Sequence, residues 1–178
     1  MLRLEEISKS FCDMESVAAL NNEAFPEEER EEIDTFIEYA EEGICDFLAV
    51  YDENIFVGFV LLALNRSTAY LCYFAVDSKL RSKGYGSKIL ALLKERYKDK
   101  QIVLDLERTD EESTNKEQRV SRKEFYLRNG FVESGFILSY SGMTFEVLFY
   151  GEKFDKQSYV DLFEIVRDTT VNPSILDK

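Results

Sequence analysis

Hydrophobic residues recur along the chain at two different spacings, and the spacing changes where the type of element should change. Residues 69–76, Ala-Tyr-Leu-Cys-Tyr-Phe-Ala-Val, form an almost unbroken apolar and aromatic run, which is typical of a strand buried on both faces. Beyond a polar segment, Ile89, Leu92, Leu93 and Tyr97 recur at the spacing that places them on one face of a helix. The pattern predicts a buried strand, a turn and an amphipathic helix in the middle of the chain.

The rest of the chain alternates in the same way between apolar runs and amphipathic segments. A helix is expected to begin at Pro26, because proline suits the first helical position and three glutamates follow it. Strands are expected at residues 2–7, 45–51, 55–64, 69–76, 101–106, 131–139 and 143–150, and helices at residues 11–25, 26–42, 84–97, 119–129 and 155–168. This order predicts the α+β (mixed α/β) class, with a mixed sheet of about seven strands flanked by helices on both faces. We expect a single domain over residues 1–170 and a frayed tail over residues 171–178.

Composition and charge narrow the classes of partner. The chain has 178 residues, 45% of them hydrophobic, so it can bury a proper core. A formal net charge of -13 disfavours nucleic acid and suits a cationic substrate such as an amine. An anionic cofactor would need a local concentration of cations. Such cations occur at Arg81, Lys83, Lys88, Arg119, Arg122 and Lys123.

Cysteine and histidine usage bears on metals and on the cellular compartment. Cys12, Cys45 and Cys72 are odd in number and widely spaced, so we expect reduced thiols and neither a disulfide framework nor a metal site. The chain has no histidine, which further disfavours zinc. We find no signal peptide and no apolar run of membrane-spanning length, and therefore expect a cytoplasmic protein without a membrane partner. The oligomeric state is left open, with a homodimer as one alternative.

The segment Arg81-Ser-Lys-Gly-Tyr-Gly86 joins the predicted strand to the predicted helix. Two glycines remove the Cβ atoms that would hold a phosphate away from the backbone amides. The first turn of the helix then offers N–H groups without partners and a partial positive charge to an anion. The segment therefore predicts a backbone cradle for a phosphate-bearing cofactor.

Two other interpretations of these glycines are open. They could serve the turn alone, as glycines between a strand and a helix often do. Gly84-Tyr-Gly-Ser-Lys-Ile89 also begins like a dinucleotide-binding GxGxxG, with Asp105 about where such a site places an acid for the ribose. The third glycine is replaced by Ile89, however, and the polar residues 77–83 separate the strand from the first glycine. Both details disfavour an NAD site and an oxidoreductase.

A second motif follows some forty residues downstream, in the run Arg122-Lys-Glu-Phe-Tyr-Leu-Arg-Asn-Gly-Phe131. Val-Asp-x3-Arg-x2-Gly-x-Gly followed by Phe-Tyr-x2-Asn-Gly-Phe resembles the GNAT superfamily of N-acetyltransferases. The resemblance is firm over residues 69–132 and extends more loosely from the N-terminus to about residue 150. It implies the GNAT-like acyl-CoA N-acyltransferase fold. The residues that carry it are Val76, Asp77, Arg81, Gly84, Gly86, Phe125, Tyr126, Asn129, Gly130 and Phe131.

The resemblance implies acetyl-CoA as cosubstrate and assigns its contacts. The backbone of Phe74, Ala75 and Val76 would pair with the pantetheine arm, and an amide at Phe74 or Val76 would polarise the thioester carbonyl. The family usually has an asparagine seven positions before the tyrosine, and Arg119 stands there in this chain, with Gln118 and Asn115 as nearby substitutes. The pyrophosphate would be wrapped by Ser82, Lys83, Gly84, Tyr85, Gly86 and Ser87, beside Arg81.

The chemistry implied by the resemblance needs an acid and a base. Tyr126 is the candidate acid, because a phenol can protonate the departing thiolate. Glu107 is the candidate base, with Asp105 sharing its face of the strand, while the preceding strand holds no acid. For Glu27 and Glu28 a role in acceptor binding stands against a solvated first helical turn. Glu23 lies in the same acceptor region, and Tyr73 is a further acceptor-site candidate.

These residues favour an N-acetyltransferase in which a primary amine attacks acetyl-CoA directly within a ternary complex. No covalent enzyme intermediate is expected, since Cys72 lies in an apolar strand. The alternative is a non-catalytic acyl-CoA-binding regulatory module, suggested by the missing strand acid and by Arg119 in place of asparagine. The acceptor amine cannot be named from the sequence.

Overall fold

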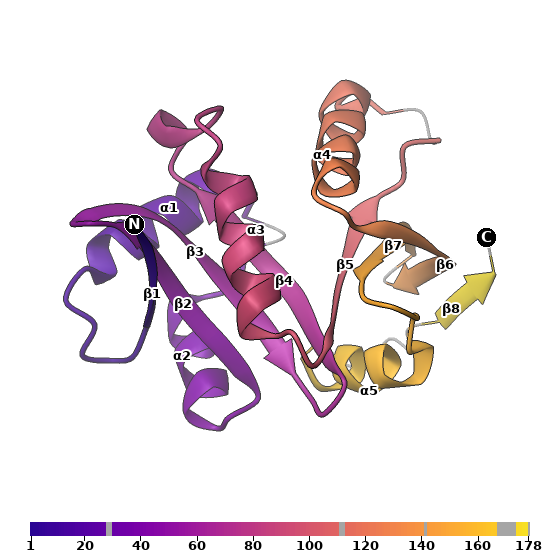
Figure 1. The fold of residues 1–178 in the computed structure, drawn as a ribbon, viewed down its shortest axis with the longest axis horizontal. Helices are drawn as coiled ribbons and strands as arrows, with labels where there is room; N and C mark the ends of the chain where they lie inside the picture. The colour runs from indigo at the N-terminus through magenta and orange to yellow at the C-terminus, as the bar shows by residue number, and fades with distance from the viewer. Residues whose placement is uncertain (28–29, 111–112, 141, 167–173, 178) are drawn as a thin grey trace. The chain divides into compact units, whose positions relative to one another are not determined.

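The computed structural model describes residues 1–27, 30–110, 113–140, 142–166 and 174–177, and its ribbon is drawn in Figure 1. The chain divides into two compact units. The first comprises Met1–Leu64 and Leu71–Arg96, and the second comprises Asn65–Tyr70 and Tyr97–Lys178. The strands follow the order β1-β2-β3-β4-β5-β7-β6-β8 in a mixed sheet. This confirms the predicted α+β class and the helix-flanked mixed sheet.

The first unit contains an antiparallel arrangement of β1, β2 and β3, next to which β4 lies. Its core is built from alternate strand residues, such as Phe47, Phe59 and Tyr73, packed against the buried sides of α1 and α2. Because side chains alternate across a strand, one face of the strands is filled by these two helices. The elements of this unit are β1 (Leu2–Glu6), α1 (Met14–Ala24), α2 (Ile33–Glu41), β2 (Cys45–Asp52), β3 (Ile55–Leu64), β4 (Thr68–Val76), the short 3-10 helix η1 (Ser78–Leu80) and α3 (Tyr85–Arg96).

Helix α3 covers the opposite face of the same strands (Figure 1). Its Ile89, Leu90 and Leu93 are buried, and so are the strand residues that alternate with the core of the other face, for example Val50 and Val60. The run that predicted a strand buried on both faces therefore belongs to a sheet with helices on both faces. The apolar run predicted this burial correctly, because a strand covered on both sides has no face exposed to solvent and therefore needs no polar residues.

Strand β3 approaches β4 closely at Gly58. A Cβ atom added to Gly58 would stand 2.0 Å from the carbonyl oxygen of Ala75, which is far inside van der Waals contact. The β2–β3 register shifts between Val50 and Tyr51, beside this point, and Val57 accepts a backbone hydrogen bond from Asp77 at 2.9 Å. The glycine thus lets β3 support the end of β4, from which the glycine turn begins.

The second unit is built on β5, to which the first residues of β4 are joined. Thr68–Tyr70 pair in parallel with Gln101–Val103, and β7 pairs antiparallel with the other edge of β5. The elements of this unit, besides the start of β4, are β5 (Gln101–Glu107), α4 (Lys116–Arg128), β6 (Val132–Tyr140), β7 (Met143–Tyr150), α5 (Lys156–Val166) and β8 (Ser174–Asp177).

Two sequence expectations are corrected. The second helix begins at Ile33 and not at Pro26, so Glu27 lies outside it. The physical reason is that the buried residues of this helix, Phe36 and Ile37, begin after Ile33, and packing of an apolar stripe outweighs a favourable first-turn composition.

The expected tail at 171–178 contains β8, whose residues pair antiparallel with β6. Backbone groups at a strand edge accept any extended segment that can reach them, which composition alone does not reveal. The seven predicted strands are present, and β8 is an eighth. The single domain over residues 1–170 stays a prediction. Within the described ranges, no helix has the length and apolar character required to cross a membrane.

We predict that Gly58→Ala destabilises the protein by about 2–3 kcal/mol, because the added methyl group meets the Ala75 carbonyl and forces the two strands apart. Gly43→Ala is the matched control: its Cβ meets nothing within 4 Å, although its φ of +74° carries the ordinary left-handed penalty of about 1 kcal/mol. Thermal and denaturant unfolding of both variants measure the difference. Equal losses in the two variants would show that the close approach is not tightly packed.

Candidate functional site

The turn between β4 and α3 is held by hydrogen bonds that use its side chains. Asp77 accepts from the backbone N–H of Lys79 at 2.8 Å, and Arg81 donates through Nε to the carbonyl of Val76 at 3.1 Å. Ser82 and Gly84 have φ angles of 62° and 80°. Left-handed residues turn successive N–H groups toward one side, and for Ser82 this conformation is unusual. Gly84 thus takes a conformation that favours glycine, Ser82 takes it without being one, and the phosphate cradle stays a prediction.

The N–H groups of this turn point to a binding role for its backbone. In the described part of the chain, no protein acceptor takes a hydrogen bond from the backbone N–H of any residue from Ser82 to Ser87, and the first helical bond runs from Lys88 to the carbonyl of Gly84 at 3.2 Å. Six successive donors at a helix N-terminus suit an anion with several oxygens, such as a diphosphate. The side chains of Lys83 and Ser87 are exposed beside them.

Tyr85 contributes its backbone to the turn while its side chain is committed elsewhere. Its hydroxyl donates to Asp52 Oδ2 at 3.0 Å, and the ammonium of Lys88 lies 5.2 Å from the centre of its ring. The hydrogen bonds from the Met1 amino group and then from Tyr85 lower the pKa of Asp52, and the bond to Asp52 raises that of Tyr85. The first residue of α3 is thus tied to the β2–β3 hairpin.

The predicted pantetheine strand, Phe74 to Val76, forms the end of β4. Ala75 is buried, and Phe74 and Val76 are half-buried. Tyr73, the acceptor-site candidate, packs its ring edge-on against Phe25 at 5.0 Å and is 7% exposed. The structure therefore places Tyr73 in the core of the first unit, and its acceptor role stays a prediction.

Tyr126 lies on the buried side of α4, 8% exposed, with its ring edge-on to Phe125 at 5.1 Å and to Phe131 at 5.5 Å. Its hydroxyl makes no hydrogen bond with any described residue. Burial raises its pKa well above the ordinary value; nearby Arg122 opposes this effect and Asp105 adds to it. The phenol consequently keeps its proton throughout the neutral range, as a proton donor must.

Glu107 and Arg119 bind each other. Arg119 Nη2 lies 2.7 Å from Glu107 Oε1, and Arg122 Nη1 lies 3.3 Å from Glu107 Oε2. Arg119 also donates through Nε to Asn115 Oδ1 at 2.8 Å and through Nη1 to the Arg108 carbonyl at 3.2 Å. Both carboxylate oxygens of Glu107, the candidate base, therefore bind arginines. All three guanidinium nitrogens of Arg119, the candidate cofactor ligand, bind other groups of the protein. The pair joins the end of β5 to the start of α4, and the roles of Glu107 as base and of Arg119 as cofactor ligand stay predictions.

The acceptor role of Glu27 and Glu28 stays a prediction. Glu27 is exposed, outside any helix, and Glu28 lies outside the described residues. Sequence reasoning also missed a partly buried ionic cluster in the second unit, where Lys123 contacts Glu146 and, at 2.7 Å, the exposed Glu133. Burial lowers the pKa of Lys123, but the hydrogen bonds with the two glutamates outweigh it, so the net direction is upward. No spacing in the sequence marks this cluster, because its members come from three elements.

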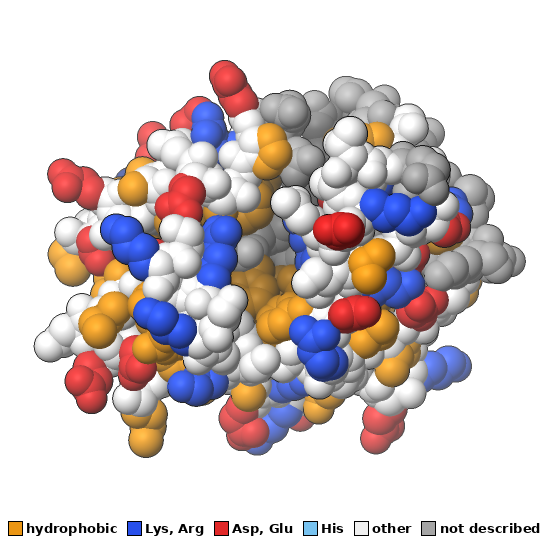
Figure 2. Space-filling model, turned by 90° about the horizontal axis from the view of Figure 1, so that it is seen from above, with side chains coloured by type: hydrophobic (Ala, Val, Ile, Leu, Met, Phe, Trp, Pro, Cys, Tyr) orange, Lys and Arg blue, Asp and Glu red, His pale blue; other side chains and the backbone are white. Residues whose placement is uncertain are grey.

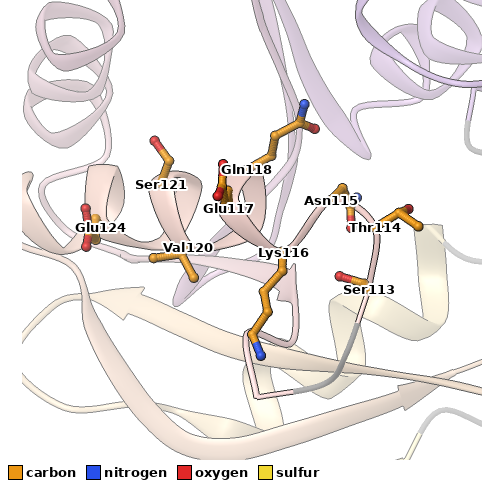
Figure 3. Close-up of a pocket in the computed structure, with 9 residues that line it drawn as sticks. All are labelled: Ser113, Thr114, Asn115, Lys116, Glu117, Gln118, Val120, Ser121 and Glu124. Atoms are coloured by element: carbon orange, nitrogen blue, oxygen red, sulfur yellow. The ribbon is translucent and has the colours of Figure 1, made fainter.

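A hollow of about 710 Å³ lies along the first turns of α4 and the segment before it (Figure 3). Gln118, one of the substitutes considered for the family asparagine, is exposed and lines it, as does Asn115. On the face that Figure 2 shows, Lys and Arg side chains are interspersed with acidic and hydrophobic ones, and no continuous basic surface appears there. Among the described residues, no group of three His, Cys, Asp or Glu side chains is arranged to hold a metal ion.

Comparisons with known proteins identify the family and agree with the fold. The model of the acetyltransferase (GNAT) family matches residues 13–131. A putative GNAT acetyltransferase from Bacteroides thetaiotaomicron superposes with a TM-score of 0.70 and 27% identity, over 90% of this chain and 93% of that one. A search of curated proteins finds no match.

Two other solved structures share the fold at lower identity. An aminoglycoside 6'-N-acetyltransferase complexed with coenzyme A has a TM-score of 0.63 and 16% identity, over 86% of this chain and 99% of that one. A chimera of the Vibrio cholerae spermidine N-acetyltransferase SpeG and hSSAT has a TM-score of 0.62 and 18% identity, over 83% and 93%.

We predict that Arg119→Lys destabilises the protein by about 1–3 kcal/mol and leaves the Kd for coenzyme A within about threefold. A single ammonium cannot replace three guanidinium donors, and those donors serve the protein itself. Arg122→Lys, which removes a longer and more exposed contact with the same glutamate, should cost under about 1 kcal/mol. Denaturant unfolding and calorimetry check both. A much larger loss of coenzyme A affinity than of stability in Arg119→Lys would restore Arg119 as a cofactor ligand.

Proposed function

The chain belongs to the acetyltransferase (GNAT) family and is an acyltransferase, and we propose that it moves an acetyl group from acetyl-CoA to a primary amine by direct attack within a ternary complex. The observation that carries this proposal is the run of six backbone N–H groups, from Ser82 to Ser87, for which the described residues supply no hydrogen-bond acceptor.

The run fits the diphosphate of coenzyme A. Hydrogen bonds from N–H groups to an anion are shorter and stronger than neutral ones, and a helix N-terminus adds a partial positive charge. A side chain at Gly84 would meet nothing within 4 Å, so the space in front of this residue is open. Lys83 and Arg81, exposed at the rim, would add charge in a protein whose net charge is otherwise strongly negative.

The reactive end of the cosubstrate is assigned by the family pattern. We place the pantetheine arm along the backbone of Phe74, Ala75 and Val76, with an amide at Phe74 or Val76 polarising the thioester carbonyl. Gly58 supports this proposal, because the close approach that it permits fixes the backbone at Ala75.

Tyr126 is the proposed acid. Its ring is held by Phe125 and Phe131, and its hydroxyl is protonated and uncommitted within the described residues. When the carbon–sulfur bond breaks, the phenol can give its proton to the thiolate. The upward direction of its pKa makes it a weak acid, so we expect a contribution near the lower end of general acid catalysis.

We propose direct transfer to the amine, without a covalent enzyme intermediate. Burial raises the pKa of the Cys45 thiol to about 12, which keeps it from forming a nucleophilic thiolate at neutral pH. The acceptor is proposed to be a cationic amine, since the protein carries a net charge of -13 and two structural neighbours are a spermidine and an aminoglycoside N-acetyltransferase.

Release of coenzyme A in the presence of a panel of polyamines, aminoglycosides and peptides tests this function. We predict turnover with at least one cationic amine, and a kcat about 10²-fold lower in Tyr126→Phe with both KM values changed under about threefold. Tyr150→Phe, a half-exposed tyrosine of the same unit, is the control and should keep wild-type kcat.

The outcomes separate the alternatives. Tight binding of acetyl-CoA in calorimetry without transfer to any amine would favour a regulatory module that binds acyl-CoA. Unchanged kcat in Tyr126→Phe would remove this residue from the reaction while leaving the enzyme assignment in place.

A second prediction concerns the glycine turn. S-acetylpantetheine, which has the thioester but lacks the diphosphate and the nucleotide, should show a KM at least about 10²-fold above that of acetyl-CoA, because the N–H run of residues 82–87 has no anion to bind. The KM of the amine should be unaltered. Similar KM values for the two thioesters would contradict a role for the turn in binding.

A further inference from the structure

Asp105 is a half-buried carboxylate on β5 that two buried tyrosines hold from different elements. Tyr70, on β4, donates its hydroxyl to Asp105 Oδ1 at 2.6 Å, and Tyr159, on α5, donates to the same oxygen at 3.1 Å. The two tyrosines are 1% and 0% exposed. Two phenol donors on one oxygen fix the orientation of the carboxylate, since both rings are locked by packing.

The second oxygen of Asp105 is uncommitted. Among the described residues, none donates a hydrogen bond to Oδ2, and the residue is only half-buried. A carboxylate can accept about four hydrogen bonds. The two tyrosines use only Oδ1 of Asp105, so Oδ2 is still able to accept a proton. Glu107, two residues on, differs in this respect because arginines engage both of its oxygens.

The position of Asp105 follows the end of the β4–β5 ladder. The parallel register between these strands runs to Tyr70 and Val103, and Asp105 is the next residue of β5 on the same face as Val103. Tyr126, from α4, is close enough for the charge of Asp105 to act on it. Beyond the end of the ladder, β5 thus carries a carboxylate with one oxygen fixed by two phenols and one oxygen that no described residue engages.

We propose that Asp105 accepts, directly or through one water, the proton that the ammonium form of the acceptor amine must lose before attack. This inference rests on the proposed function. An alkyl ammonium with a pKa near about 10.4 is almost wholly protonated at neutral pH and has no lone pair with which to attack. A fixed carboxylate with an uncommitted oxygen supplies the missing acceptor.

The protons balance as follows. The ammonium gives one proton to Asp105, and the nitrogen lone pair forms a bond with the acetyl carbon. As the carbon–sulfur bond breaks, its electron pair leaves on sulfur, which takes the proton of Tyr126. The nitrogen then loses a second proton to the Tyr126 phenolate, and Asp105 releases its own proton to solvent. The net products are the amide, the free thiol of coenzyme A and one proton.

Several elements contribute groups around Asp105. Tyr70 contacts it from β4 and Tyr159 from α5, its partner on β7 is Val147, and its charge acts on Tyr126 of α4. Charged side chains on the same elements include Arg122, which acts on Tyr126, and Glu107, which binds Arg119 and Arg122.

The test is the pH profile of kcat/KM for the amine in wild type, Asp105→Asn and Tyr159→Phe. Asparagine keeps an oxygen that can accept from the tyrosines and loses the basic site. We expect Asp105→Asn to lower kcat/KM about 10²-fold at pH 7. The difference in kcat/KM between the variant and the wild type should become smaller as the pH rises, because the free amine then forms without a base. Tyr159→Phe removes a clamp but keeps the base, and should retain the wild-type shape of the profile.

Chemical rescue provides a second measurement, which does not depend on Asp105→Asn folding. Formate added to Asp105→Ala should restore part of the turnover at neutral pH, and should leave Tyr126→Phe unimproved. Thermal unfolding of each variant identifies any loss that comes from stability alone.

Three results would overturn the assignment: wild-type kcat/KM in Asp105→Asn, a loss by the same factor at every pH, or the predicted pH signature in Glu107→Gln instead. If the wild-type protein transfers acetyl to no amine of the panel, the proposed function fails before Asp105 is tested. The two failures are therefore distinguishable.

Discussion

Backbone donors without acceptors are expensive to keep, and the six N–H groups of residues 82–87 are the feature from which the function follows. Helices normally satisfy such groups with a capping side chain or with water. Here the left-handed residues Ser82 and Gly84 hold them on one side of the turn. Arg81, bonded to Val76, and Asp77, bonded to Lys79, stabilise this conformation from within the turn. The shape is built in the protein before any anion arrives, which reduces the entropy lost on binding.

The second unit uses charge differently, to position elements. Glu107 and Arg119 fasten the start of α4 to the end of β5, and Lys123 binds two glutamates beneath the same helix. Tyr126 is carried on the apolar side of α4 between these ionic groups. Arg119, which stands where the family usually has asparagine, bonds Glu107, Asn115 and the Arg108 carbonyl, and its predicted contact with the cofactor is untested. Partly buried ion pairs are costly when one member is removed, which explains why such residues act as a set.

Much of the fold and part of the candidate site could be predicted from the sequence. The unbroken apolar run of β4 and the two glycines are local signals, because strand burial and turn conformation depend mainly on the residues themselves. The start of α2, the pairing of Glu107 with Arg119 and the need for glycine at position 58 depend on what lies opposite in the fold. Asp105 shows most clearly what the sequence alone cannot predict. Its spacing placed it on the same strand face as Glu107, but the two tyrosines that hold one of its oxygens lie 35 and 54 positions away in the sequence.

The central claim is that these six amides bind the diphosphate of coenzyme A. Amide hydrogen exchange of the full-length protein, with and without coenzyme A, measures this directly. The account predicts that exchange at residues 82–87 slows at least about tenfold when coenzyme A is bound, with smaller changes in the β2–β3 hairpin. Binding of coenzyme A with unaltered exchange at these residues would contradict it.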